Sequence, residues 1–158
     1  MRIVLSYPTS TVGMLYPNLW LPEEQPYHID YSRRGSLTMC PSAELELTPW
    51  GLTAIEGIHT LRIVELLPAS GTYHYAVYNI LGSPDLGAMA IPWSAWEAKV
   101  QMYDTTGLIA TYQVPIEGSG QWWSVLEIDA YDGSVRGINT VGADPSPYGD
   151  TGQGCSAE

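Results

Sequence analysis

Glycine and proline interrupt this chain so often that they argue against long helices. The 158 residues include 16 Gly and 12 Pro, spread along the whole length. Both residues disfavour helix interiors, and they mark the turns that join short strands. The segments between these turns are rich in Tyr, Trp and Thr, which fit half-buried pleated surfaces. The sequence therefore predicts an all-β protein long enough to bury one core.

Alternation of apolar and polar residues locates the strands. It is clear in YHIDYS (27–32) and AELELT (43–48) and strongest in TYHYAVYNI (72–80). Pro17 indicates that the segment 11–22 is an edge strand or contains a bulge, because proline cannot donate to a sheet. The other expected strands are 2–7, 11–22, 59–67, 99–104, 108–115, 121–131 and 134–141. Nine to ten short strands with almost no helix predict an antiparallel β-sandwich, immunoglobulin-like or jelly-roll in topology.

The first strand is unusual because it is apolar on both faces. Ile3, Leu5 and Tyr7 share one face and Val4 lies on the other, before Pro8 ends the segment. Such a strand must be covered, either by its own sandwich or by the sheet of a neighbouring subunit, as in strand addition. We divide the chain into an N-terminal strand and linker (1–13), a sandwich domain (14–141) and a Pro/Gly-rich tail (142–158).

Charge excludes several classes of partner. The formal net charge is −11, with only six Lys and Arg, which disfavours nucleic acid and anionic membrane surfaces. No apolar run approaches the roughly 20 residues of a membrane helix, so membrane insertion is not expected. Few Lys and many Thr, Tyr and Trp indicate an extracellular or cell-surface protein whose leader has been removed. Cys40 and Cys155 either form a disulfide or remain a buried thiol and a free thiol in the tail.

No motif for catalysis, nucleotide binding or zinc binding is present, so neither an enzyme nor a cofactor or metal is expected. Aromatic residues are the remaining candidates for a binding role. Tyr73, Tyr75, Trp122 and Trp123 are candidates for a contact surface for glycan or protein. Strand alternation requires one Trp of the QWWS segment to point inward and its neighbour outward.

The order of several segments resembles secreted bacterial domains of the YfaP type, which are poorly characterised β-sandwiches. The resemblance covers residues 14–141, and GTYHYAVYN and WWSVLEID carry most of it. Family members have acidic stretches that look like a metal site. In this chain MLYPNLW and ELELTPW stand in their place. Met14, Tyr16 and Asn18 occupy the positions of two acids and a His, and Glu46 is among the few acids retained. The resemblance therefore implies the fold and weakens a metal-binding role.

Two functions follow from these patterns. The first is a non-enzymatic extracellular structural protein that assembles with itself into a filament or array, using the strand of Ile3, Val4, Leu5 and Tyr7 at a sheet edge. The alternative is a carbohydrate- or surface-binding module that uses exposed Trp and Tyr side chains. Fold alone does not decide between them.

Overall fold

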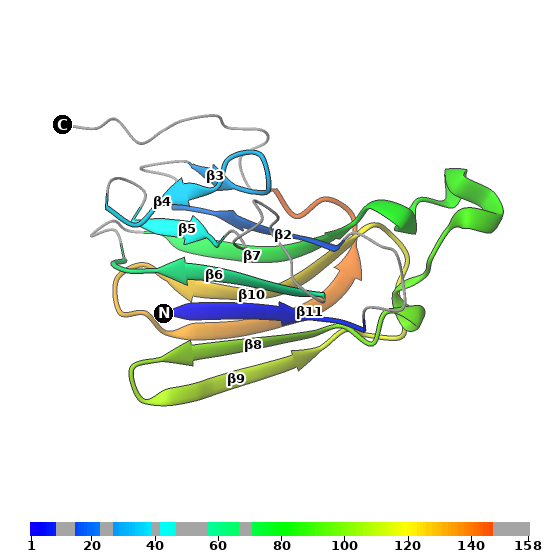
Figure 1. The fold of residues 1–158 in the computed structure, drawn as a ribbon. Coiled ribbons are helices and arrows are strands. Elements are labelled where there is room, and N and C mark those ends of the chain that lie inside the picture. The colour runs from blue at the N-terminus through cyan, green and yellow to red at the C-terminus, as the bar shows by residue number, and fades with distance from the viewer. Residues whose placement is uncertain (9–14, 23–26, 39–41, 47–56, 67–70, 147–158) are drawn as a thin grey trace.

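The computed structural model of this chain is a sandwich of two antiparallel sheets (Figure 1). It describes residues 1–8, 15–22, 27–38, 42–46, 57–66 and 71–146. The six-stranded sheet holds, in spatial order, β4 (Gly35–Ser36), β5 (Ala43–Leu45), β6 (Ile58–Ile63), β1 (Arg2–Ser6), β8 (Lys99–Asp104) and β9 (Gly107–Gln113). The five-stranded sheet holds β11 (Val135–Gly142), β10 (Trp122–Asp129), β7 (Thr72–Asn79), β2 (Leu15–Trp20) and β3 (His28–Ile29).

This arrangement confirms the expected all-β sandwich. The described residues form eleven strands where nine to ten were expected, because β4 is only two residues long and shows no alternation. Pro17 lies inside β2, where β7 is the partner strand and β3 pairs only with Leu19 and Trp20. Around Pro17 the strand therefore behaves as an edge, which is where proline is tolerated.

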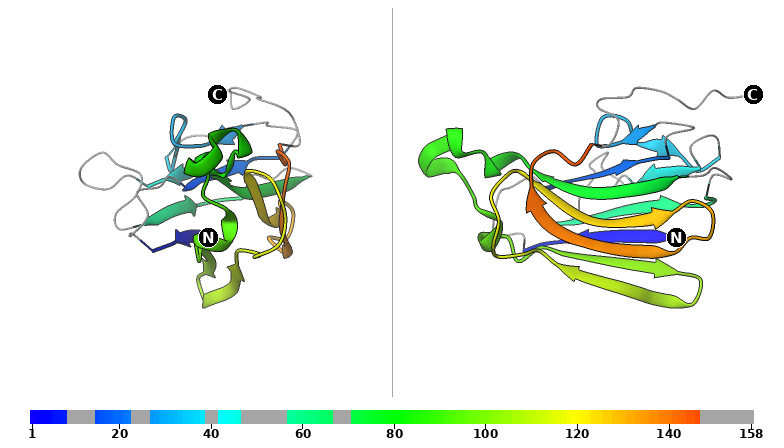
Figure 2. Two further views of the ribbon diagram at one scale, coloured as in Figure 1. Left: turned by 90° about the vertical axis from the view of Figure 1, so that its right-hand side faces the viewer. Right: turned by 180° about the vertical axis from the view of Figure 1, so that it is seen from behind.

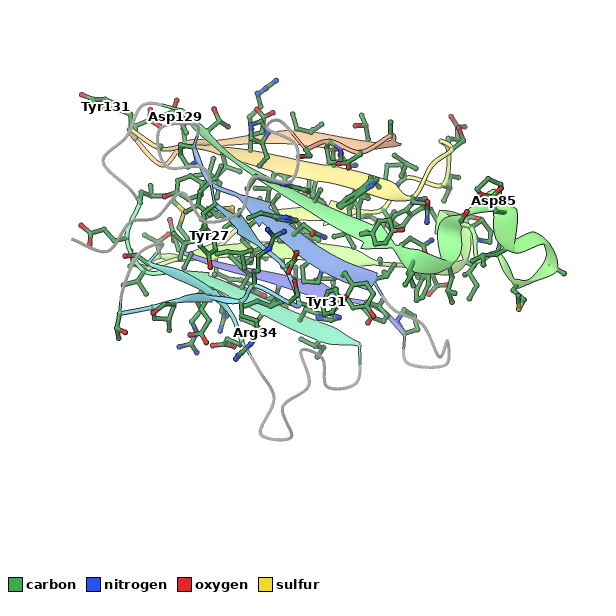
Figure 3. The ribbon with its side chains drawn as sticks, turned by 90° about the horizontal axis from the view of Figure 1, so that it is seen from above. Tyr27, Tyr31, Arg34, Asp85, Asp129 and Tyr131 are labelled. Atoms are coloured by element: carbon green, nitrogen blue, oxygen red, sulfur yellow. The ribbon has the colours of Figure 1, made fainter. Side chains whose placement is uncertain are left out.

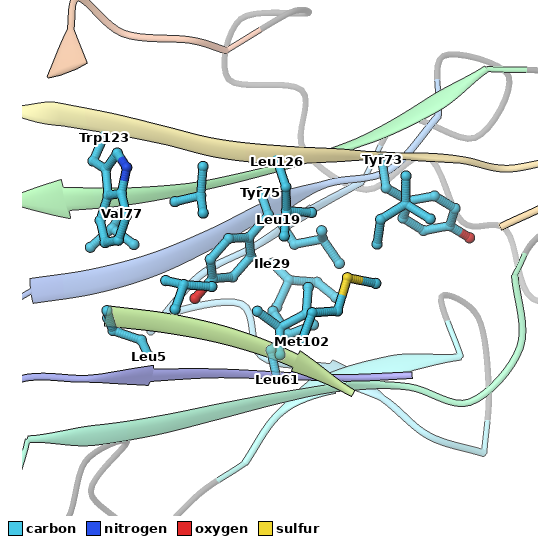
Figure 4. Close-up of a cluster of buried hydrophobic side chains, with 14 of the residues drawn as sticks. Leu5, Leu19, Ile29, Leu61, Tyr73, Tyr75, Val77, Met102, Trp123 and Leu126 are labelled. Carbon is cyan, nitrogen blue, oxygen red and sulfur yellow. The ribbon is translucent and has the colours of Figure 1, made fainter. Parts of the chain in front are cut away.

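The core fills the space between the two sheets (Figure 4). Alternate residues of each strand point inward, so Leu5 from β1 and Leu61 from β6 face Leu19 and Tyr75 from the other sheet. These side chains are at most 1% exposed. Burial of the apolar stripes of both sheets is what holds the two layers together.

β1 is a central strand of the six-stranded sheet. It pairs with β6 on one side and β8 on the other, so that Ile3 lies opposite both Leu61 and Met102. Ile3 and Leu5 are completely buried, and Val4 is half-buried on the outer face. Within one chain the strand is therefore covered by its own sandwich, the first of the two alternatives. Donation to a neighbour stays a prediction, and it would require β1 to leave both partner strands.

A loop of three short 3-10 helices projects from one end of the sandwich (Figure 2). They are η1 (Ile80–Gly82), η2 (Pro84–Met89) and η3 (Trp93–Ala95). Asn79 anchors the loop, since its side chain accepts from Leu81 N–H (3.1 Å) and donates to Ile91 C=O (2.9 Å). Figure 3 shows Asp85 in this projecting loop, at the opposite end of the molecule from Asp129 and Tyr131.

Candidate functional site

Three of the four aromatic residues expected at a contact surface lie in the core (Figure 4). Tyr73 and Trp123 are 0% exposed and Tyr75 is 1% exposed. The expectation is wrong for these three because β7 and β10 turn these positions toward the six-stranded sheet. Trp122 alone faces outward, half-buried, as alternation with Trp123 requires.

Trp122 begins a row of aromatic side chains across the outer face of the five-stranded sheet. The register places Trp122 opposite Tyr78, and Tyr78 opposite Tyr16. The ring centroids of Tyr78 and Trp122 are 4.8 Å apart. Tyr31 continues the row, because its ring lies 5.0 Å from that of Tyr16 and is largely exposed. The aromatic row thus spans β10, β7 and β2 and ends just beyond β3.

A second large aromatic residue, Trp20, lies beside this row. Trp20 pairs with His74, four residues along β7 from Tyr78. Ala76 separates the two positions, and its small side chain lets Trp20 and Trp122 approach to 5.6 Å between centroids. Although it is on the outer face, Trp20 is only 2% exposed. This part of the surface is therefore packed like an interior.

A chain of hydrogen bonds fixes the side chain of His28 against Trp20. The two rings stack at 4.6 Å with an interplanar angle of 10°. Arg33 Nη2 donates to His28 Nδ1 (3.0 Å), and His28 Nε2 lies 2.8 Å from Asn18 Oδ1. Because a guanidinium can only donate, Nδ1 must accept, and the network assigns the proton of a neutral His28 to Nε2. Asn18 Nδ2 in turn donates to Tyr16 C=O (2.8 Å).

Asp30 holds the other end of this chain. Its Oδ1 accepts from Ser32 N–H (2.8 Å), Ser32 Oγ (2.7 Å) and Arg33 N–H (2.8 Å), and its Oδ2 accepts from Arg33 Nη2 (3.3 Å). Burial alone would raise the pKa of Asp30, but these hydrogen bonds and the neighbouring His28 outweigh it and lower the pKa. Asp30 is thus an ionised anchor for the turn that carries Arg33.

These residues enclose a pocket of about 330 Å³, here called the outer-face pocket. Its walls combine aromatic, amide, imidazole, guanidinium, carboxylate and hydroxyl groups. The lining residues are Asn18, Trp20, His28, Asp30, Arg33, Trp122, Asp144 and Ser146. A concave site with apolar walls and a few fixed polar groups is the usual form of a small-molecule site.

Of these lining residues, only Trp122 was a site candidate from sequence. Asn18 had been noted as a replaced ligand position in the family-like segment, and it lies in the pocket. Trp20, His28, Asp30 and Arg33 were not grouped from the sequence because their meeting depends on the pairing of β2 with β3, a strand of two residues. The available signal was the polar set His28 and Asp30 in the alternation of YHIDYS, followed by Arg33.

The remaining candidates lie elsewhere. Ile3, Val4 and Leu5 belong to β1, and the Tyr7 hydroxyl lies 3.1 Å from His59 Nε2 at the end of the six-stranded sheet. Cys40 and Cys155 fall outside the described residues, so the disulfide stays a prediction. Within the described ranges, no group of three or more His, Cys, Asp or Glu side chains is placed to hold a metal ion. No helix in that part of the chain is long and apolar enough to cross a membrane.

Comparison with family models and with curated proteins finds no match for this chain. The resemblance to YfaP-type domains therefore stays a prediction, and the functional argument rests on the outer-face pocket.

Proposed function

We propose that this chain is a non-enzymatic, extracellular binding module that takes a neutral carbohydrate in the outer-face pocket. The observation that carries the proposal is the half-exposed indole of Trp122 beside a fixed set of polar side chains in one concave site. A sugar ring presents an apolar C–H face, which stacks on an aromatic ring, and a rim of hydroxyl groups, which need donors and acceptors. The pocket offers both kinds of contact together.

Preorganisation supports a binding role. Asn18 and His28 are held by hydrogen bonds to each other, and Arg33 is held by His28 and Asp30. A ligand that contacts these groups does not have to order them first, so less affinity is lost to conformational entropy. Donors also remain for it, since neither indole N–H of Trp20 and Trp122 has a partner among the described residues.

Charge favours a neutral ligand. The pocket contains two carboxylates, Asp30 and Asp144, against one guanidinium, Arg33. The chain carries −11 overall, so an acidic sugar would be repelled at long range as well as in the site. Few Lys and many Thr, Tyr and Trp support an extracellular location.

The same carboxylates argue against hydrolysis of the sugar. A glycosidase needs a carboxylic acid whose raised pKa keeps it protonated as the proton donor. The hydrogen bonds to Asp30 lower its pKa instead. Asp144 lies on the exposed surface, where its Oδ1 accepts from Ser146 N–H (2.8 Å). The proposed module therefore holds its ligand without transforming it.

The test is an array of neutral and acidic glycans, followed by calorimetric titration of the best ligand. We expect Trp122→Ala to weaken binding by about tenfold or more, which corresponds to about 1.4 kcal/mol or more. Tyr103→Ala, an aromatic truncation on the outer face of the other sheet, is the matched control and should leave the affinity unchanged. Absence of neutral-glycan binding, or binding that survives Trp122→Ala, would contradict the proposal.

Self-assembly, the function that the N-terminal strand suggested first, is a separate proposal. It rests on a different part of the molecule, the strand of Ile3, Val4, Leu5 and Tyr7, and it would require β1 to leave β6 and β8.

A further inference from the structure

Arg33 is held in the wall of the outer-face pocket by two acceptors. Its Nη2 donates to His28 Nδ1 (3.0 Å) and to Asp30 Oδ2 (3.3 Å). The Arg33 side chain is 28% exposed, so water can take the place of an acceptor that it loses. The position of this guanidinium therefore depends on the state of His28 and Asp30.

His28 can accept this hydrogen bond only while its imidazole is neutral. Protonation turns Nδ1 from an acceptor into a donor. The new N–H would then face Arg33 Nη2, another donor, across 3.0 Å. Both groups would also carry a positive charge, and like charges at this distance repel one another. Protonation of His28 therefore breaks its hydrogen bond with Arg33.

Asp30 offers the protonated imidazole a replacement partner. Its Oδ2 lies 3.7 Å from His28 Nδ1, so a small shift brings a protonated Nδ1 within hydrogen-bond distance. Oδ2 is the oxygen for which both cations compete, because Oδ1 already accepts three hydrogen bonds. The ring itself is favoured where it stands, since an imidazolium stacked on Trp20 gains a cation–π contact and Nε2–H still donates to Asn18 Oδ1. Arg33 is thus the group that is released.

We propose that the outer-face pocket is controlled by pH: protonation of His28 releases Arg33 from the pocket wall into solvent and weakens the binding of a neutral carbohydrate. Neutral His28 keeps the guanidinium in place as a donor, and the imidazolium takes over its contact with Asp30. The loss of affinity in acid rests on the proposed function, whereas the release of Arg33 follows from the hydrogen-bond network alone.

The other charged and titratable groups around His28 define the controls. Asp30 stays ionised in mild acid, because its hydrogen bonds lower its pKa. β2 contributes an indole and an amide, neither of which titrates. His74 lies on the far side of Trp20, which pairs with both histidines, and Asp144 lines the same pocket. His74→Gln and Asp144→Asn therefore separate these two groups from the effect of His28.

The first test needs no ligand. Nitrogen NMR of the imidazole and guanidinium groups follows the whole chain from about pH 8 to about pH 5, on either side of the ordinary pKa of His. We expect a neutral His28 with its proton on Nε2 at the upper end, and Arg33 signals that change as Nδ1 gains its proton. Arg33 signals that stay constant while His28 titrates would overturn the proposal. A His28 that stays neutral throughout the range would do the same.

The second test is calorimetric titration, over the same pH range, with the neutral glycan that binds most tightly on the array. We expect the affinity to fall by about tenfold on acidification, because the pocket loses a charged donor. The midpoint of the fall should coincide with the titration of His28 seen by NMR, since the two are linked. An affinity that does not change with pH would contradict the proposal, whereas absence of any neutral-glycan binding would contradict the proposed function alone.

Two variants test whether the effect passes through these residues. His28→Asn offers Arg33 an acceptor, Oδ1, that does not titrate, and Arg33→Met lacks the group that leaves. Both should bind with little dependence on pH, whereas His74→Gln and Asp144→Asn should keep the dependence of the unsubstituted protein. Circular dichroism checks that each variant is folded. A full pH dependence in His28→Asn would show that another group controls the pocket.

Discussion

The outer faces of the two sheets differ in how deeply their outward-pointing side chains are buried. On the five-stranded sheet, Trp20 and Asn18 are 2% and 4% exposed although they point away from the core. On the six-stranded sheet, Arg62 pairs with Glu46, and both side chains are at least one-third exposed, 52% and 33%. The first face therefore excludes water from Trp20 and Asn18, whereas the second leaves Arg62 and Glu46 solvated.

The polar contacts differ accordingly. On the six-stranded face they are separate and exposed: Arg2 lies 4.5 Å over the ring of Tyr103, and Arg34 lies 3.8 Å from Glu44. Such exposed contacts contribute little to stability. On the five-stranded face Asn18, His28, Arg33 and Asp30 form one connected network. Such connection is expected because a buried donor or acceptor without a partner is costly. The comparison teaches that outward orientation in a sheet does not by itself mean exposure.

Truncating one aromatic residue on each face should give the largest difference in stability between the two faces. We expect Trp20→Ala to lower the free energy of unfolding by about 3–5 kcal/mol, as for a core residue. Tyr103→Ala on the other face should cost less than about 1 kcal/mol. Urea unfolding of both variants measures the two values. Equal costs would mean that the two faces are packed alike.

Removal of one polar partner from each face gives a smaller difference. Asn18→Ala removes the hydrogen bonds that Asn18 makes with His28 Nε2–H and with the C=O of Tyr16, and we expect a cost of about 1–3 kcal/mol. Arg62→Ala breaks an exposed ion pair with Glu46 and should cost about 0–1 kcal/mol. Equilibrium unfolding at one pH and ionic strength compares them. A larger loss of stability for Arg62→Ala than for Asn18→Ala would contradict the view that polar contacts on the five-stranded face contribute more to stability.

Acid should weaken the five-stranded face through His74. Burial lowers the pKa of His74, and Arg136 adds to this, although Glu127, 3.2 Å away, acts in the opposite direction. In the unfolded chain His takes up a proton near pH 6.5, whereas in the folded chain it does so only at lower pH. Between these values the unfolded chain binds more protons, so the free energy of unfolding falls as the pH falls.

Unfolding measured from about pH 8 to about pH 5, on either side of the ordinary pKa of His, tests this effect. His74→Gln should reduce the loss of stability on acidification, because the glutamine does not titrate. Glu127 keeps its contact with Arg136 in that variant. The same pH dependence with and without His74 would show that this side chain does not contribute.

Much of the fold could be predicted from the sequence because strand alternation and turn residues are local signals. They placed ten of the strands and the opposite orientations of Trp122 and Trp123. The same alternation, followed consistently along β7, turns Tyr73 and Tyr75 inward whenever His74 faces out. The error there came from treating aromatic residues as surface candidates without assigning the strand's two faces.

The pocket could not be predicted because it depends on pairings between segments. Trp20 and His28 meet across β2 and β3, and Trp122 joins them from β10, about a hundred residues later in the chain. Local patterns do not reveal such registers. The sequence left the place of β1 open for the same reason, since an apolar strand fits equally well in its own sheet or in a neighbour's.

The position of β1 also has a consequence for synthesis of the protein. Arg2 lies opposite Arg62 on β6 and opposite Tyr103 on β8, so β1 gains its second neighbour only after residue 103 has been translated. Until residue 104 has been translated, Ile3 and Leu5 have no complete cover. A fold whose contacts are so distant along the chain is expected to form slowly. An apolar strand without its neighbours is prone to aggregation, so we expect aggregation of the incompletely folded chain to begin at β1.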